Sequence, residues 1–127
     1  MSEPDSPPRL VDVTALQAAA DAFARERDWE RFHSPKNLAM ALTGEVGELV
    51  ELFQWLTEAE SHEVARDERT ARAVRDELAD VTIYLARLAA VLGVDLDEAV
   101  RAKLAINAVK YPADRSRGSA AKYRDYE

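Results

Sequence analysis

The chain has 127 residues, a formal net charge of −7, two histidines and no cysteine. This length suits a single domain, and the lack of cysteine excludes disulfides and thiolate metal sites and favours a reducing compartment. The acidic balance opposes binding to the phosphate backbone of a polynucleotide. No apolar run approaches the ~18 residues of a membrane span, and the first ten residues lack the apolar stretch of a signal peptide. We therefore expect a cytoplasmic protein with no polynucleotide or membrane partner.

Four stretches of the chain have apolar residues at helical spacing. In chain order, the expected helices run from about Asp12 to Arg27, Ser34 to Leu56, Thr70 to Leu92 and Leu96 to Lys110. Asp12, Ser34 and Asp95 are the expected N-caps, and Gly93 suits the left-handed residue after a helix end. The mostly charged residues 57–69 predict a linker or a short exposed helix.

No stretch shows the alternation of a strand, so the predicted fold is all-α. Residues 1–10 hold three of the five prolines and no periodic apolar pattern, which predicts a disordered arm. Residues 11–112 would form the helical domain. Residues 113–127 would form a basic C-terminal tail.

Acidic residues occupy the second expected helix where an apolar face should be. At about 100° per residue, Glu45 lies within roughly 20° of Leu52 and roughly 60° of Leu38, inside the apolar stripe. Glu48 lies about 60° to one side, near Ala41. Charges in such places are costly unless they are compensated. A cation is the simplest compensation.

Glu77 and Asp80 repeat this spacing on the third expected helix. Two helices that face each other would gather Glu45, Glu48, Glu77 and Asp80, and four such carboxylates require a cation or raised pKa values. A site of oxygen ligands without histidine or cysteine favours Mg²⁺, or Mn²⁺, over zinc and copper. The simpler interpretation is that these acids are solvated. A di-iron redox bundle is a third, which the placement of both histidines disfavours.

Several motifs in this order resemble the MazG-like all-α nucleoside triphosphate pyrophosphohydrolases, which carry E-x-x-E, a spacer and E-x-x-D. The resemblance is closest to the dCTP pyrophosphatase branch and covers about residues 12–123. It rests on Glu45-x-x-Glu48, Glu77-x-x-Asp80, Arg27-Asp28-Trp29, Phe32-His33-x-Pro35-x-Asn37-Leu38, Gly44 to Leu49, Phe53-Gln54-Trp55, Tyr111-Pro112 and Arg115 to Ala120.

The resemblance implies a four-helix bundle that assembles as a homo-oligomer, a tetramer built from dimers. It implies hydrolysis of a deoxynucleoside triphosphate, with dCTP or a modified dCTP favoured, to the monophosphate and pyrophosphate, in cleaning of the nucleotide pool. Glu45, Glu48, Glu77 and Asp80 would hold Mg²⁺. Glu51 would hold a second ion or orient the attacking water, unless it is a solvated surface acid.

The substrate-binding residues that the resemblance implies lie on three of the helices and beside them. They are Trp29, Asn37, Trp55, Tyr84, Lys103, Asn107, Lys110 and Tyr111. The tryptophans would stack on the base or line its pocket, although either could be core. Lys103, Asn107 and Lys110 share one face of the fourth helix and would contact phosphate, base or sugar, although a solvated face is the alternative.

Three further features bear on the substrate. Arg115, Arg117 and Lys122 would contact phosphate, in the same or a neighbouring subunit. His33 fits a local structural hydrogen bond at least as well as a catalytic role. The dCTP-specific animal members carry a histidine where this chain has Ala20, which weakens the expectation of cytosine selectivity. The alternative to an enzyme is a non-catalytic helical domain whose acidic seam binds a metal or a partner.

Overall fold

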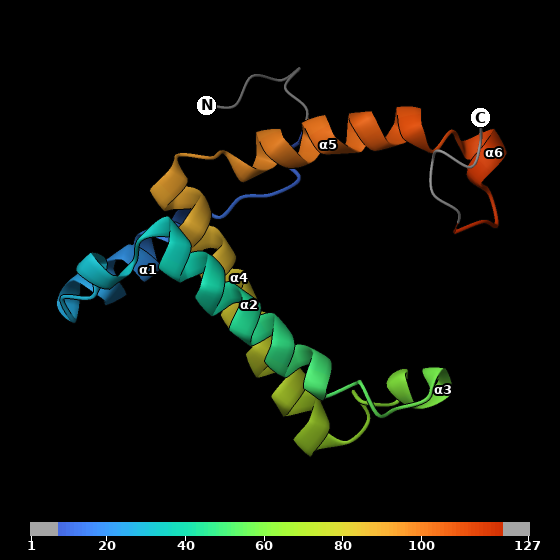
Figure 1. Cartoon of the computed structure of the whole chain (residues 1–127), viewed down its shortest axis with the longest axis horizontal. Helices are drawn as coiled ribbons and strands as arrows, with labels where there is room; N and C mark the ends of the chain where they lie inside the picture. The colour runs from blue at the N-terminus through green and yellow to red at the C-terminus, as the bar shows by residue number, and fades with distance from the viewer. Residues whose placement is uncertain (1–7, 121–127) are drawn as a thin grey trace. The chain divides into compact units, whose positions relative to one another are not determined.

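The computed structural model describes residues 8–120, and within them every regular element is helical, as the sequence predicts. The elements are α1 (Thr14–Glu26), the 3₁₀ helix η1 (Glu30–Phe32), α2 (Pro35–Glu51), α3 (Glu58–Ser61), α4 (Glu68–Leu92), α5 (Leu96–Lys110) and α6 (Ala113–Ser116). The described residues form two units (Figure 1). One unit is residues 13–94, and the other is residues 8–12 together with residues 95–120.

The unit of residues 13–94 is built on the antiparallel pair α2 and α4, which lie side by side along most of their length (Figure 1). Helix α1 packs against α4. The side chain of Gln17 donates a hydrogen bond from Nε2 to the carbonyl oxygen of Ala86 over 3.0 Å, which ties α1 to α4. This pairing places the acid-bearing faces of α2 and α4 in the same unit.

Local signals fix the ends of the two long helices. The hydroxyl of Ser34 accepts a hydrogen bond from the backbone N–H of Asn37 over 3.1 Å, and Pro35 occupies the first helical position. Asp67 caps α4 by accepting from the N–H of Arg69. Helix α4 ends at Gly93, whose φ of 68° is the left-handed conformation that glycine adopts without strain. The predicted roles of Ser34 and Gly93 are confirmed.

In the other unit, α5 begins at Asp95, whose carboxylate accepts from the N–H of Glu98 as predicted. The buried carboxylate of Asp97 accepts hydrogen bonds from the N–H groups of Leu10 (2.6 Å) and Val11 (3.0 Å), and from Nε of Arg101. The backbone bond from Val11, with those from Arg101 and Leu10, lowers the pKa of Asp97 to about 2 despite its burial. Residues 10 and 11 are thereby held against α5. Residues 1–7 of the predicted arm lie outside the described residues.

Three boundaries differ from the prediction, and one is the start of α4, at Glu68 rather than near Thr70. The N-cap of α1 is Val13 rather than Asp12, and no side chain caps this helix. Helix α2 ends at Glu51 rather than near Leu56. After Glu51 most backbone hydrogen bonds change to the tighter i→i−3 type, as from the N–H of Leu52 to Leu49 and from the N–H of Leu56 to Phe53. The extended backbone of Thr57 (ψ 165°), whose capping box begins α3, then separates the two helices. The short elements η1 and α6 were not predicted.

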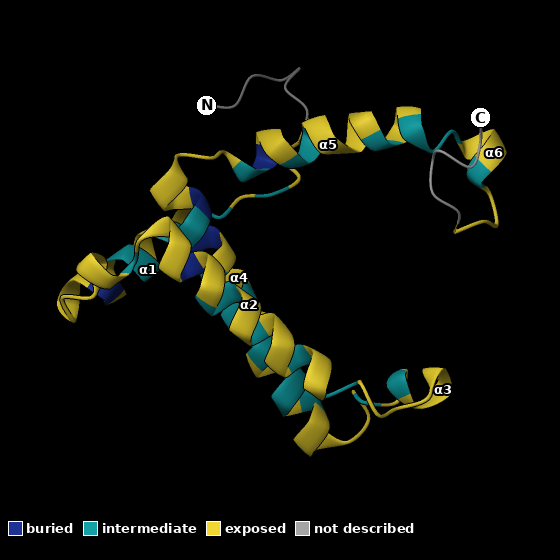
Figure 2. Cartoon of the chain, viewed as in Figure 1, coloured by how far each residue is buried: buried dark blue, intermediate teal, exposed yellow. Residues whose placement is uncertain are grey.

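The buried apolar core of the described residues is small (Figure 2). Its members are Ala24, Leu38, Ala86 and Ala89, of which Leu38 is the largest, at 1% exposed. Many large apolar side chains are exposed, including Met40 and Val50 on α2 and Leu78 and Leu85 on α4. The described residues of the unit 13–94 therefore leave much apolar surface on α2 and α4 exposed.

Candidate active site

Helices α2 and α4 bring three carboxylates together. One oxygen each from Glu45, Glu48 and Glu77 can be chosen so that all three atoms lie within 4.8 Å of one another. Glu45 and Glu77 are half-buried and Glu48 is exposed. The sequence predicted that two facing helices would gather four acids, and the structure brings three of these four together.

Two oxygens of this cluster lack hydrogen-bond partners. Oε2 of Glu45 and Oε2 of Glu77 are both buried, and no described residue donates a hydrogen bond to either. The contact with the Glu45 carboxyl, burial and the nearby charge of Glu48 raise the pKa of Glu77 to about 7. The contact with Glu77 favours the ionised form of Glu45, but burial and the charges of Glu48 and Asp80 outweigh it and raise the pKa of Glu45. The cluster therefore needs a proton or a cation.

The donor set fits a hard divalent cation. It contains carboxylate oxygens only, and the two orphaned oxygens face the same group of acids. Asp80 is not one of the three clustered acids, although its charge acts on Glu45 and its side chain lines the adjoining pocket. Glu51, at the end of α2, is exposed and also outside the cluster. The roles of Asp80 and Glu51 as ligand and water-orienting group stay predictions.

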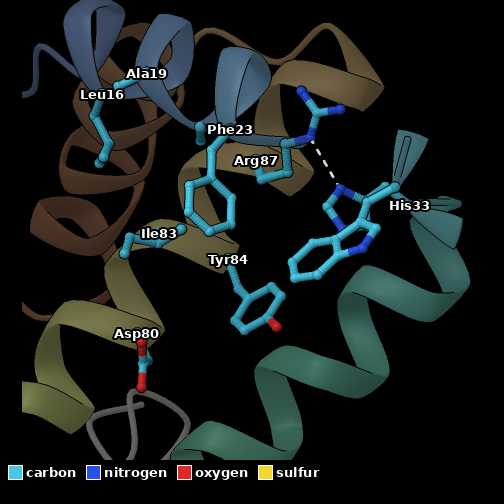
Figure 3. Close-up of a pocket in the computed structure, with 10 residues that line it drawn as sticks. Leu16, Ala19, Phe23, His33, Asp80, Ile83, Tyr84 and Arg87 are labelled. Carbon is cyan, nitrogen blue, oxygen red and sulfur yellow. Dashed lines mark hydrogen bonds between the residues drawn. The ribbon is translucent and has the colours of Figure 1, made fainter. Parts of the chain in front are cut away.

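A pocket of about 380 Å³ extends from Asp80 between α1, α4 and the segment that joins α1 to α2 (Figure 3). Its lining is mainly apolar and aromatic. The lining residues are Leu16, Ala19, Ala20, Phe23, Trp29, His33, Asp80, Ile83, Tyr84 and Arg87. Asp80 lies at one end of this group and His33 and Arg87 at the other (Figure 3). A ligand with an anionic group and an apolar or aromatic group could therefore bind here. Its anionic group would lie at the acidic cluster, through a cation, and its aromatic group in the pocket.

Trp29 reaches the pocket because of the way α1 ends. Asp28 has φ 54°, and the N–H of Trp29 bonds to the carbonyl of Ala24 over 2.9 Å. This closure is the Schellman type, in which a left-handed residue turns the chain back over the helix. The indole then meets the ring of Phe23 edge to face, with centroids 5.7 Å apart. Both rings line the pocket.

Two predicted binding residues of this unit do not line that pocket. Trp55 is 86% exposed. The expected helix ran to Leu56 and so included Trp55, but α2 ends at Glu51 and Trp55 lies beyond it. The side chain of Asn37 donates to the carbonyl of Phe32 over 3.0 Å and helps to shape the start of α2. Substrate contact by either residue stays a prediction.

The remaining predicted contacts belong to the unit that contains α5. Lys103, Asn107 and Lys110 lie on α5, and Tyr111 is its C-cap. Lys103 is exposed, and the other three are half-buried. Of the basic residues in the predicted tail, Arg115 lies in α6, Arg117 follows it and Lys122 lies outside the described residues. Their contact with phosphate also stays a prediction.

Arg87 and Phe23 were not singled out from the sequence as pocket residues. In the chain Arg87 lies between the apolar residues Leu85 and Leu88 of this helix. The structure buries Arg87, at 8% exposed, and pairs it with Asp21 of α1. The partners are 66 positions apart, so no local spacing rule indicates the pair. The sequence offered one indication that Arg87 is buried, namely its position next to apolar residues of the helix.

None of the described helices combines the length and the apolar composition that crossing a bilayer requires.

Comparisons with known proteins agree with this geometry. The model of the MazG-like family matches residues 41–126. dCTP pyrophosphatase 1 of Rattus norvegicus is 52% identical over 118 residues, which span 93% of this chain and 68% of the rat protein. dCTP pyrophosphatase 1 of Homo sapiens is 50% identical over 118 residues, with the same two shares.

A solved structure is also similar. The crystal structure of a pyrophosphatase from Archaeoglobus fulgidus superposes with a TM-score of 0.73 at 38% identity, over 85% of this chain and 99% of that one. The matched family model covers more than half of the chain and includes all three clustered glutamates. This chain belongs to the MazG-like family.

Proposed function

We propose that this chain is a metal-dependent nucleoside triphosphate pyrophosphohydrolase that converts a deoxynucleoside triphosphate, dCTP first, to the monophosphate and pyrophosphate. The observation that carries the proposal is the cluster of Glu45, Glu48 and Glu77 beside an aromatic pocket. The chain is 50–52% identical to proteins named dCTP pyrophosphatase 1, which supports both the proposed reaction and cytosine as the preferred base. Cleaning of the nucleotide pool is the corresponding role, in the cytoplasm.

Glu45, Glu48, Glu77 and Asp80 would hold Mg²⁺, or Mn²⁺ in its place. When bound, such an ion offsets the negative charge of the phosphate oxygens and stabilises the charge that develops during cleavage. The carboxylates themselves repel a triphosphate, so the same cluster makes substrate binding conditional on the metal. Glu51, one helical turn beyond Glu48, would orient the attacking water or hold a second ion.

The pocket would receive the base. Trp29, Phe23 and Tyr84 line it, and aromatic faces of this kind stack on a base with about 1–3 kcal/mol per base. Trp55, exposed after α2, would add a second stacking surface in the assembled enzyme. Because every base has a face that can stack, discrimination has to come from polar groups at the base edge. Asn107 is the candidate that the sequence indicated.

The stacking proposal has a direct test on two tryptophans. Trp29→Ala and Trp55→Ala should each weaken the binding of all four dNTPs together, by roughly 5- to 150-fold, because stacking tolerates any base. Asn107→Ala should instead narrow the difference between dCTP and the other dNTPs. The measurement is kcat/KM for the four dNTPs on each variant. Unchanged values for Trp55→Ala would assign Trp55 to packing or to a subunit interface.

We further propose that the enzyme is a homo-oligomer, a tetramer built from dimers. The small buried core and the exposed apolar side chains of α2 and α4 support this proposal. In such an assembly Lys103, Lys110 and the basic residues after α5 would contact the triphosphate of their own or a neighbouring subunit. Sedimentation equilibrium tests the assembly, and a monomer at micromolar concentration would contradict it.

The reaction is tested with a panel of common and modified dNTPs, with and without Mg²⁺, by measuring pyrophosphate release. Metal-dependent release, fastest with dCTP or a modified dCTP, is expected. Metal binding without turnover of any nucleotide would instead favour a non-catalytic helical domain. Glu58→Gln, an exposed acid at the start of α3, is the matched control for substitutions in the cluster.

A further inference from the structure

Arg87 is a buried cation that takes no part in the acidic cluster. Its Nη1 donates to Oδ1 of Asp21 over 2.9 Å, and its Nε donates to Nδ1 of His33 over 3.4 Å. The hydrogen bond from Arg87 is the main reason that the pKa of Asp21 is lowered. Arg87 thus connects α4 to α1 and to the residue just before the N-cap of α2. A buried ion pair is by itself weak evidence for stability, so its second contact, to His33, needs a separate explanation.

The contact decides which nitrogen of His33 carries a proton. A guanidinium has only donor groups and does not lose its charge in proteins, so Nδ1 of His33 must act as the acceptor. A neutral imidazole that accepts at Nδ1 carries its proton on Nε2. Burial, followed by the positive charge of Arg87, lowers the pKa of His33, which keeps the ring neutral. The imidazole is therefore a donor on the side opposite Arg87.

That donor belongs to the pocket. His33 lines the end away from Asp80, and Arg87 lies on the side of the imidazole that faces away from Tyr84 (Figure 3). The ring also meets Trp29, with centroids 6.5 Å apart. No described residue accepts a hydrogen bond from Nε2 of His33. An unused N–H group thus stands at the end of a pocket whose walls are mainly apolar and aromatic.

We propose that Arg87 is a positioning residue that holds His33 in the Nε2–H tautomer, and that His33 donates a hydrogen bond to the edge of the base. This inference rests on the proposed function, because it takes the pocket as the site of the base. A donor at this end can bond to a ring nitrogen or a carbonyl oxygen at the edge of a base. Cytosine presents two such acceptors side by side, N3 and O2.

The first measurement is the two-bond ¹H–¹⁵N spectrum of the imidazoles in the full chain without nucleotide. The chain has two histidines, so His62→Gln assigns both signals. The spectrum separates the two neutral tautomers, and His33 should show a bare Nδ1 and a protonated Nε2. Arg87→Met should remove this preference. Arg72→Met, an exposed arginine on the same helix, is the matched control.

The second measurement is the affinity for dCMP with Mg²⁺ present. Arg87→Met should weaken dCMP binding by about 2- to 12-fold, the loss expected for one neutral hydrogen bond. Arg87→Met alone leaves the charge of Asp21 without its partner. The double variant Asp21→Asn, Arg87→Met removes both charges and should lose the same amount of dCMP affinity. Arg87→Lys keeps the charge beside Asp21 but not the planar fork. It should therefore restore thermal stability and not the tautomer of His33.

The outcomes separate this inference from the proposed reaction. An Nδ1–H tautomer in the wild-type chain, or dCMP affinity that is unchanged in the folded Arg87 variants, would overturn the inference even if pyrophosphate is released normally. The expected tautomer with the expected loss of dCMP affinity would support it. If both results were found but no dNTP gave pyrophosphate, the proposed reaction would be wrong and the role of Arg87 and His33 would stand.

Discussion

Binding of Mg²⁺ to this chain at pH 6 should release close to one proton. The pKa of Glu77 is about 7 in the metal-free structure because Glu45, burial and Glu48 disfavour its charge. The ratio of protonated to ionised carboxyl is then about 10 to 1 at pH 6 and about 1 to 10 at pH 8. A bound cation requires the ionised form. Proton release should therefore fall from about 0.9 per chain at pH 6 to about 0.1 at pH 8.

The assay is calorimetric titration with MgCl₂ in buffers of different ionisation enthalpy, which yields the number of protons released. Because Glu45 and Glu77 are in contact, the proton belongs to the pair rather than to one residue. Glu77→Gln should abolish the release, and Glu58→Gln, an exposed acid on α3, should leave it unchanged. If the wild-type chain bound Mg²⁺ at pH 6 without releasing a proton, the pair of Glu45 and Glu77 would not hold the proton that we assign to it.

The same raised pKa sets the sign of the pH dependence of stability without metal. The folded state of Glu77 holds its proton up to about pH 7, whereas the unfolded chain loses it near the ordinary value of 4.5. The stabilisation is complete below pH 4.5 and is lost as the pH rises through 7. The Tm of the metal-free chain should therefore fall from pH 5 to pH 8. Saturating Mg²⁺ should reverse the fall.

Two other substitutions test the fold that positions the site. Leu38→Ala should reduce the free energy of unfolding by about 2–5 kcal/mol, because Leu38 is the largest fully buried side chain of the described residues; urea denaturation measures it, and a loss below about 1 kcal/mol would contradict the assigned core. At the left-handed position after α1, Asp28→Gly should be neutral or slightly stabilising, whereas Asp28→Val should destabilise by about 1–2 kcal/mol. Equal Tm values for the two Asp28 variants would contradict the left-handed backbone.

The two acid pairs could be predicted because the position of each pair on its helix depends on local rules. Glu45 and Glu77 each intrude into an apolar stripe of a helix, and helical periodicity is readable from the chain. Ser34, Gly93 and Asp95 were also predictable, since each acts on backbone groups within a few residues of itself.

The far end of the pocket could not be predicted in the same way. The pairing of Arg87 with Asp21 and His33 joins three elements across the unit, and only packing brings them together. The turn at Asp28 replaces the glycine that usually marks this kind of helix end, so it left no recognisable signal. Trp55 was misplaced because the helical angle was continued past Glu51, where α2 ends.

The most direct test of the proposed reaction is ³¹P NMR of the products of dCTP incubated with the purified chain and Mg²⁺. We expect dCMP and pyrophosphate in equal amounts. The products should form with Glu58→Gln and be lost with Glu48→Gln, which should keep its helical circular dichroism, or with EDTA. The appearance of dCDP and orthophosphate as first products, or wild-type turnover by Glu48→Gln at saturating Mg²⁺, would contradict the proposed reaction and its metal site.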